Sequence, residues 1–380
     1  MDAVIVGAYE LPERVIPNKN LINVFEQASR GAIVDAGIDV SDIDGLFLSN
    51  LPGLVPAFTL AEHLGIEPRW TDSTRIGGTT GLASVLHAVA AIRAGKCRAA
   101  LIVYGSLSRS MRVAIGTGGV LQEISEERET VYGPTVSSRY GMFARRHMYE
   151  FGTTLEQLAA PAVSAREWAQ LNETSVRREL LTVADILAAP RIADPLTLPM
   201  CCVITDGGGA VIVAREDLAT DVARPAIRIL GAGEHTVHRD VVSKVPFTTT
   251  AVKLAASDAF KEAGLRPDEM DLCTVYDSFT ITVITALEDA GFCPKGEGGP
   301  FVEGGRLGPH GSLPTNPDGG GLATNHPGMR GVFLIVELVR QLRGEAGARQ
   351  VPNARLGVAI GVGGTIDSRH ASGVLVLGRA

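Results

Sequence analysis

The sequence predicts an α/β protein built from two copies of one structural unit, with an insertion in the first copy. Segments of the first 220 residues recur in similar order after residue 220, which is typical of a duplicated architecture. Aromatic residues make up only 5% of the 380 residues, while glycine and alanine are abundant. Small residues allow helices and strands to approach closely in packed layers. We therefore divide the chain into an N-terminal half, 1–220, and a C-terminal half, 221–380.

The first repeated element is a helix followed by a strand. The stretch ASRGAIVDAGIDVSDIDGLFLSN begins at Ala28, and it resembles ASDAFKEAGLRPDEMDLCTVYDS, which begins at Ala256. Each predicts an amphipathic helix that ends at an Ala-Gly pair before an apolar strand. Gly37 and Gly264 suit the position after a helix, where a positive φ is favoured. The stretch VIVGAY near the N-terminus predicts a buried strand that precedes the first helix.

The second repeated element is a glycine-rich turn that leads into a long apolar helix. GGTTGLASVLHAVAAIRAG ends at Gly95, and HPGMRGVFLIVELVRQLRG ends at Gly344. The third element is a closing strand, GAVIVA at 209–214 and GVLVLG at 373–378. Fewer residues separate the two closing strands from each other than separate the two long helices. The first copy therefore carries extra residues between its long helix and its closing strand, and we place them at about 106–200.

This insertion lies outside the repeat. Its stretch SSRYGMFARRHMYEFGTTLEQLAAPAV is helical by periodicity, and the regions around Gly116–Gly119 and Asp194–Met200 are typical of loops. Long insertions on a repeated scaffold often carry function. We predict that this one is a lid or substrate-binding domain.

Composition and charge exclude several classes of protein. The formal net charge of −7 disfavours binding to nucleic acid, and no uncharged apolar run is long enough to predict a membrane span. The first residues lack the pattern of a secretory signal, and the five cysteines are scattered. No Cys-x-x-Cys pair or zinc spacing is present, so we expect no metal site and a cytoplasmic location.

His326 is the strongest candidate for a catalytic residue. In a duplicated α/β fold, the two glycine-rich junctions tend to face one another, and each helix N-terminus offers N–H groups to an oxyanion. His326 lies at one junction, and we place Pro327 at the first helical position. A helix N-terminus would keep the imidazole neutral and ready to accept a proton. The alternative is a capping or packed histidine.

Tyr276 is the second candidate, at the end of a predicted strand and before an apolar helix. A phenol there would donate a proton to an oxyanion. The alternative is a core tyrosine with a backbone partner. We expect Asp277 to cap the following helix.

Nearly the whole chain resembles the thiolase superfamily, and more narrowly the sterol-carrier-protein-type thiolases, often labelled lipid-transfer proteins. The resemblance rests on the duplicated halves and on the motifs AAIRAGKCRAALIVYGS, RHMYEFGTTLEQLA, CCVITDGGGAVIVA, YDSFTITVITALEDAGFCPKGEGG, NHPGMRG and VELVRQLRGEAGARQV. It implies a thiolase fold with layers in the order α-β-α-β-α, in which the insertion is a loop domain. It also implies an acyl-CoA substrate, with coenzyme A as part of the substrate and no covalently bound cofactor.

Both cysteines that a thiolase uses are replaced by glycine in this chain. The nucleophile position of the family falls on Gly78, and the position of the second cysteine falls on Gly361. Without a thiolate, the chain has no means of forming the acyl-enzyme of ordinary Claisen chemistry. The resemblance instead makes these two turns, with Gly363, candidates for binding the thioester oxygen.

The other two catalytic positions of the family hold a tyrosine and a histidine. The asparagine that positions water falls on Tyr276, and the histidine of Gly-His-Pro falls on His326, with Asn325 in place of the glycine. This set suits the transfer of one proton and stabilisation of an enolate, as in a retro-aldol reaction. Asn325 is a further candidate for binding the thioester.

Thiolase-like steroid side-chain aldolases also lack the cysteines and keep this tyrosine, and they need a partner with an OB fold and a zinc ribbon. They use a further tyrosine before His-Gly-Met, where this chain has Asn325. The resemblance therefore leaves three functions open. They are an acyl-CoA lyase of aldolase type, an atypical thiolase or acyltransferase completed by a partner, and a non-catalytic scaffold that binds acyl-CoA or lipid. Steroid, aromatic and branched-chain acyl groups all remain open.

Thiolases form dimers through an edge strand of the first half. We expect a homodimer with AALIVYGS as that edge strand, since an unpaired edge invites pairing. A zinc-ribbon partner is a further possibility that the resemblance raises.

Overall fold

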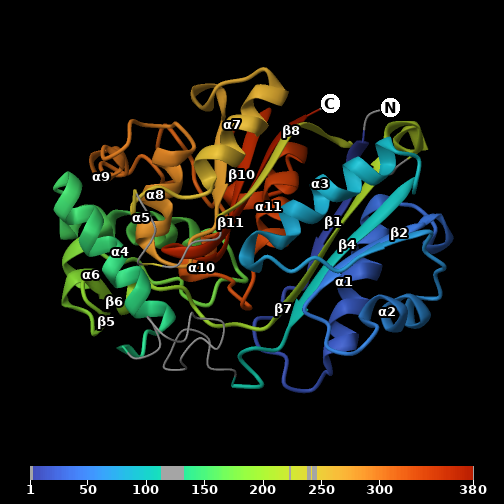
Figure 1. Ribbon diagram of the computed structural model, residues 1–380, viewed down its shortest axis with the longest axis horizontal. Helices are drawn as coiled ribbons and strands as arrows, with labels where there is room; N and C mark the ends of the chain where they lie inside the picture. The colour runs from blue at the N-terminus through green and yellow to red at the C-terminus, as the bar shows by residue number, and fades with distance from the viewer. Residues whose placement is uncertain (1–2, 113–131, 222–223, 238–240, 242–245, 380) are drawn as a thin grey trace.

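The computed structural model describes residues 3–112, 132–221, 224–237, 241 and 246–379 (Figure 1). Its described strands form one mixed sheet in the order β3-β2-β4-β7-β1-β8-β11-β10-β9, with a separate β5-β6 hairpin. The strands of the large sheet are β1 Ala3–Glu10, β2 Gly45–Ser49, β3 Trp70–Asp72, β4 Ala99–Ser106, β7 Gly207–Arg215, β8 Ile227–Val237, β9 Leu272–Val275, β10 Leu356–Thr365 and β11 Ser368–Arg379.

The two halves of the chain meet in the middle of this sheet. Strands β1 and β8 pair antiparallel, with Val4 opposite Arg228 and Ile5 opposite Ile227. Strands of the first half lie on one side of this junction and strands of the second half on the other. Because both halves contribute strands to one sheet, the sheet itself marks no boundary between two domains. Our division of the chain after residue 220 therefore stays a prediction.

Helices cover both halves of the sheet, and two of them contact strands of both halves. The helices are α1 Leu21–Ala36, α2 Pro56–Leu64, α3 Thr80–Arg93, α7 Val252–Ala263, α8 Thr280–Asp289 and α11 Gly331–Arg343. Helix α1 packs on strands of the first half and α7 on strands of the second. Helices α3 and α11 pack on each other and on strands of both halves, as Figure 1 shows. The predicted layered fold is confirmed.

Strand β4 explains how the first-half sheet is buried on both faces. Ile102 and Tyr104 join the large core shared with α3 and α11, whereas Leu101 and Val103 join a second core beneath α1 and α2. Successive side chains of a strand point to opposite faces, so a continuous apolar run fills both cores.

The position of β4 corrects the predicted dimer edge. The stretch AALIVYGS forms β4, which lies between β2 and β7 and pairs with both. The edge strands are β3 and β9 instead. A strand that is buried along its whole length is typical of the interior of a sheet, which fits the position of β4.

The predicted helix ends of the repeat are confirmed. Gly37 follows α1 with a φ of 68°, and Gly264 follows α7 with a φ of 64°. Both glycines take the left-handed conformation that closes a helix, which costs other residues a steric penalty.

The insertion forms a helical layer against the second half. Its elements are α4 Val136–Phe151, α5 Leu155–Gln170, α6 Val183–Ala188, β5 Arg191–Ala193 and β6 Leu196–Thr197. Helices α4 and α5 contact α8, and α5 also contacts α9 (Gly298–Phe301) and α10 (Gly320–Ala323). The helical prediction holds with a break at Gly152, and the region predicted as a loop at 194–200 contains part of a hairpin and a turn of 3₁₀ helix. Gly116–Gly119 lie outside the described residues.

In the described part of the chain, no helix combines the length and the apolar character that crossing a membrane requires.

Candidate active site

Tyr276 lies directly after β9, where the chain leaves the sheet. Its N–H donates to the carbonyl of Ile360 in β10 at 2.9 Å, which extends the β9–β10 pairing by one residue. The next residue, Asp277, is buried and accepts from the N–H groups of Gly321 at 2.7 Å and Leu322 at 3.1 Å. Asp277 therefore caps the short helix α10 rather than α8, which corrects our expectation.

Arg330 holds the loop that carries His326. Its guanidinium is fully buried and donates to both carboxylate oxygens of Asp318, at 2.8 and 2.6 Å, and to the carbonyl of Asn325 at 3.0 Å. Its Nε lies 3.4 Å from Asp277 Oδ1. One cation thus ties the histidine loop to the residue that follows Tyr276.

Tyr276 and His326 form the predicted pair, and their contact is direct. Tyr276 Oη lies 2.9 Å from His326 Nε2 and 3.3 Å from the carbonyl oxygen of Gly328. The phenol has one proton, so it donates either to the imidazole or to the carbonyl. In the second arrangement the imidazole donates to the phenol oxygen. The pair is therefore able to pass a proton in either direction.

Burial shifts the pKa values of both groups. Only 5% of Tyr276 and 4% of His326 is exposed. Burial, together with the positive charge of Arg330, lowers the pKa of His326 to about 4. Burial raises the pKa of Tyr276 well above its usual value. At neutral pH both groups are uncharged.

The cause of the neutral imidazole differs from the one we predicted. Helix α11 begins at Gly331, so Pro327 is not its first residue and His326 lies outside the helix. Burial and Arg330, not a helix N-terminus, keep the histidine neutral.

Gly78 lies against the ring of Tyr276. It belongs to a 3₁₀ turn, Gly77–Thr79, that leads into α3. A Cβ atom at residue 78 would overlap the Cε2 and Cζ atoms of Tyr276, and it would lie 2.5 Å from the carbonyl oxygen of Val362. The tyrosine ring occupies the space that a side chain on this turn would need.

We expect Gly78→Ala to lower the free energy of unfolding by about 1–3 kcal/mol, the usual cost of overpacking. Part of that cost should disappear when Tyr276→Asn removes the ring, because the two residues compete for one space. The close contact with Val362 remains in both backgrounds, so the relief is partial. Denaturant unfolding of the two single variants and the double variant measures the coupling. An identical cost of Gly78→Ala in both backgrounds would contradict the packing argument.

The remaining predicted residues lie around the pair. Gly361 and Gly363 belong to strand β10, which corrects the turn that we expected there. A Cβ atom on either glycine would contact the side chain of Thr79. The carbonyl of Gly361 accepts from Ser372 Oγ at 2.8 Å. Asn325 is fully buried, and its Nδ2 has no hydrogen-bond partner among the described residues. That free amide is a donor close in sequence to His326. Binding of the thioester by these residues stays a prediction.

The insertion contributes an aromatic side chain near the pair. Tyr140 of α4 is 2% exposed and stacks on Phe279, with ring centroids 4.2 Å apart. Its hydroxyl interacts with Ser278, and burial is the main cause that raises its pKa. The segment that ends the insertion also reaches the site, because the N–H of Cys202 donates to the carbonyl of Ser278 at 2.9 Å.

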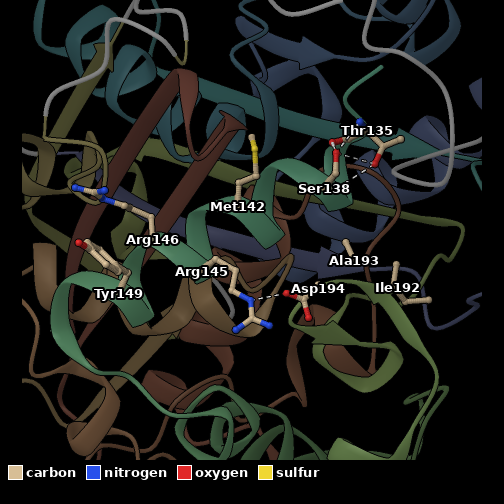
Figure 2. Close-up of a pocket in the computed structure, with 9 residues that line it drawn as sticks. All are labelled: Thr135, Ser138, Met142, Arg145, Arg146, Tyr149, Ile192, Ala193 and Asp194. Atoms are coloured by element: carbon tan, nitrogen blue, oxygen red, sulfur yellow. Dashed lines mark hydrogen bonds and ion pairs between the residues drawn. The ribbon is translucent and has the colours of Figure 1, made fainter. Parts of the chain in front are cut away.

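A cavity of about 680 Å³ lies on the face of α4 opposite to Tyr140 (Figure 2). Arg145, Arg146 and Tyr149 of α4 line it together with Ile192 and Asp194, and Arg145 pairs with Asp194. Neither Tyr276 nor His326 lines this cavity. The opposite face of α4 carries the buried residues that contact the second half, so the helix lies between the cavity and the pair.

Sequence reasoning missed Arg330 and Asp318, which organise the histidine loop. Arg330 is the charged residue of NHPGMRG and comes directly before an apolar helix. An arginine at such a position is ordinarily expected to be exposed. Among the described residues, no cluster of three or more histidine, cysteine or acidic side chains is placed to hold a metal ion.

Comparison with known proteins places the chain in a family. Residues 233–379 match the family described as "Thiolase C-terminal domain-like". The chain is 33% identical over 376 residues to an acetyl-CoA acetyltransferase of Methanothermobacter thermautotrophicus. The match covers 96% of this chain and 97% of that relative. It is 28% identical over 355 residues to a steroid side-chain-cleaving aldolase of Thermomonospora curvata, covering 88% of this chain and 89% of that protein.

A solved structure agrees over the full length. The structure named "Ltp2-ChsH2(DUF35) aldolase" superposes with a TM-score of 0.87 at 26% identity, and it covers 100% of this chain and 98% of its own.

Proposed function

This chain belongs to the thiolase superfamily, in its sterol-carrier-protein-type branch, and from that premise we propose that it is an acyl-CoA carbon–carbon lyase of retro-aldol type. The observation that carries the proposal is the contact between Tyr276 and His326, together with the tyrosine ring that fills the space beside Gly78. A glycine supplies no thiolate for an acyl-enzyme, whereas the neutral pair supplies a proton acceptor and a proton donor. A steroid side-chain-cleaving aldolase among the relatives supports the same reaction class.

The proposed substrate is a β-hydroxyacyl-CoA. The β-hydroxyl proton passes to Tyr276 Oη as the phenol proton moves to His326 Nε2, so that an imidazolium forms. The bond between Cα and Cβ breaks, Cβ leaves as the carbonyl of an aldehyde or ketone, and the electron pair remains on the thioester as an enolate. The same proton then returns through the pair to Cα and gives the shorter acyl-CoA.

The weak basicity of His326 is compatible with this route. An imidazole with a pKa of about 4 holds a proton poorly in the free enzyme. The enolate carries a negative charge that forms beside the imidazolium in a buried site, and opposite charges at close range favour the charged forms. Donors near the enolate oxygen would lower the barrier further. We assign that role to Asn325, to the turn at Gly78 and to Gly361 and Gly363 of β10.

The pH dependence of kcat/KM should show an acid limb with an apparent pKa near 4. His326 accepts a proton only when neutral, and its neutral fraction falls as pH decreases through about 4. Burial raises the pKa of Asp277 to about 6, so any effect of its titration on activity would add a second limb at that pH. The Asp277→Asn variant separates the two, because it removes any limb near 6 and keeps the one near 4. A limb near 6.5 in that variant, the ordinary value for histidine, would contradict the assignment.

The direct test is incubation of the enzyme with β-hydroxyacyl-CoA thioesters, including one with a steroid side chain. Mass spectrometry should detect a new carbonyl compound and a shorter acyl-CoA in equal amounts, without any free coenzyme A being consumed. If no thioester of the series is cleaved by the chain alone or with a partner, the lyase proposal is wrong.

A Claisen reaction is the second candidate, because one relative at 33% identity is an acetyl-CoA acetyltransferase. In that reaction free coenzyme A attacks a β-ketoacyl-CoA, and the products are two thioesters. Consumption of coenzyme A distinguishes it from the lyase in the same assay.

We also propose two protein partners. The solved Ltp2-ChsH2(DUF35) aldolase combines an aldolase with ChsH2(DUF35), which supports a partner of the OB-fold and zinc-ribbon type for this chain. A homodimer would form through β3, whose outer edge pairs with no other strand of the described sheet and whose Trp70 is 40% exposed. Light scattering of the chain, alone and co-purified with such a partner, gives the stoichiometry.

A further inference from the structure

The segment 201–206 connects the two loops that carry the proposed catalytic pair. It follows the insertion and leads into β7. The N–H of Cys202 donates to Ser278 in the tyrosine loop at 2.9 Å, and the N–H of Val203 donates to Gly321 at 2.9 Å. The N–H of Thr205 lies 3.4 Å from the carbonyl of His326. The backbone of this segment therefore bonds to both loops.

The side chain of Thr205 makes the most specific contacts of the segment. Its hydroxyl is fully buried, accepts from the N–H of His326 at 3.1 Å and donates to Asn325 Oδ1 at 2.8 Å. A hydroxyl is one of the few groups that accepts and donates at once, and the isosteric valine does neither. One side chain thus fixes the backbone of the histidine and the side chain of the residue before it.

The contact with Asn325 also fixes which end of that amide is free. Because Thr205 donates to Oδ1, the Nδ2 group points away from this bond, and it has no partner among the described residues. Arg330 holds the carbonyl of Asn325 at 3.0 Å, so the backbone of the same residue is fixed from another direction. His326 and Asn325 are therefore oriented by contacts that do not involve their own reactive atoms.

We propose that Thr205 is a positioning residue for the catalytic site: its hydroxyl sets the orientation of His326 and keeps the amide donors of Asn325 available to the thioester oxygen. This inference rests on the proposed function, because it assigns Thr205 a role in that reaction. Thr205 itself touches no reacting atom. Its effect is exerted through the geometry of two neighbours, and errors of about 1 Å in such geometry cost on the order of 10²-fold in rate.

The test compares Thr205→Val with Thr205→Ser. Valine keeps the volume and removes both hydrogen bonds, and we expect kcat to fall by about 10²-fold. Serine keeps the hydroxyl and should restore kcat to within a few-fold of the native value. Thr197→Val is the matched control, because Thr197 is also buried but donates to Ile186 inside the insertion. This control should retain native turnover.

A second readout does not depend on turnover. With ¹³C-labelled histidine, the NMR signal of His326 is assigned by its loss in His326→Gln, and its titration is followed in each variant. We expect Thr205→Val to shift this signal and its titration midpoint, while Thr205→Ser and Thr197→Val leave both unchanged. If Thr205→Val fails to fold, Thr205→Ala replaces it, since alanine fits within the volume of threonine.

The outcomes separate this inference from the proposed function. Native kcat and an unchanged His326 signal in Thr205→Val would overturn the positioning role, even if Tyr276→Phe is inactive. Equal losses in the valine and serine variants would also overturn it, because the hydroxyl would then be irrelevant. If Tyr276→Phe is fully active, the proposed reaction fails, and the NMR comparison alone decides whether Thr205 orients His326.

Discussion

Replacing Tyr276 with phenylalanine is expected to lower kcat for carbon–carbon cleavage by about 10²–10⁴-fold, the range typical of a lost acid–base group. Phenylalanine keeps the ring that fills the space beside Gly78 and removes only Oη, the atom 2.9 Å from His326 Nε2. The fold should therefore persist, with a loss of about 1 kcal/mol in the free energy of unfolding for the missing hydrogen bond. The measurement is steady-state kinetics beside denaturant unfolding.

The companion variant is His326→Gln, which keeps a polar side chain and removes the titratable one. If the two residues act as one unit, the double variant should be no slower than the slower single variant. Tyr9→Phe is a matched control, because the Tyr9 ring packs on Gly31 away from the site. Full turnover in either Tyr276→Phe or His326→Gln would refute the assignment of the pair.

Replacing Arg330 with methionine is expected to lower the free energy of unfolding by about 3–5 kcal/mol, the range found when one partner of a buried ion pair is removed. The change leaves Asp318 and Asp277 buried without their shared cation, and it also releases the carbonyl of Asn325. A loss of this size is a large fraction of the stability of a typical protein. Denaturant unfolding at pH 7 gives the difference directly.

The pH dependence of that loss supplies an internal check. Without Arg330 the two carboxyl groups repel as anions, and protonation relieves the repulsion. Asp277 already has a pKa raised to about 6 by burial, so it should take up a proton readily in the variant as pH falls. The difference in stability between the native protein and Arg330→Met should therefore shrink between pH 7 and pH 5. A constant difference would contradict this explanation, and Arg266→Met, at an exposed ion pair, should change stability little.

The sequence was most informative where local patterns decide the structure. Helix periodicity and the Ala-Gly pairs predicted α1 and α7, and Gly37 and Gly264 have the left-handed conformation expected after a helix. Tyr276 and His326 were proposed from their places at a strand end and a glycine-rich junction, and the family resemblance pointed to the same two positions. Their side chains are in contact although they lie 50 residues apart in sequence.

The predictions that failed depend on contacts that are distant in sequence. Whether β4 is an edge or an interior strand depends on which strands pair with it, and its partner β7 begins about 100 residues later. Asp277 caps α10 instead of the adjacent α8 because the histidine loop returns beside it. Thr205 carried no signal at all, because an isolated threonine before a glycine-rich strand is ordinary unless its neighbours in space are known.

The packing of α3 on α11 has a consequence for how the protein is made. Helix α3 is complete in the nascent chain at Arg93, but α11, which packs on it, begins only at Gly331. At ordinary rates of translation this interval lasts on the order of tens of seconds. During that time the apolar faces of α3 and of strands β1 and β7 that pack on α11 are uncovered. We therefore expect ribosome-bound chains that end before α11 to recruit chaperones, and chains that include it to be released from them.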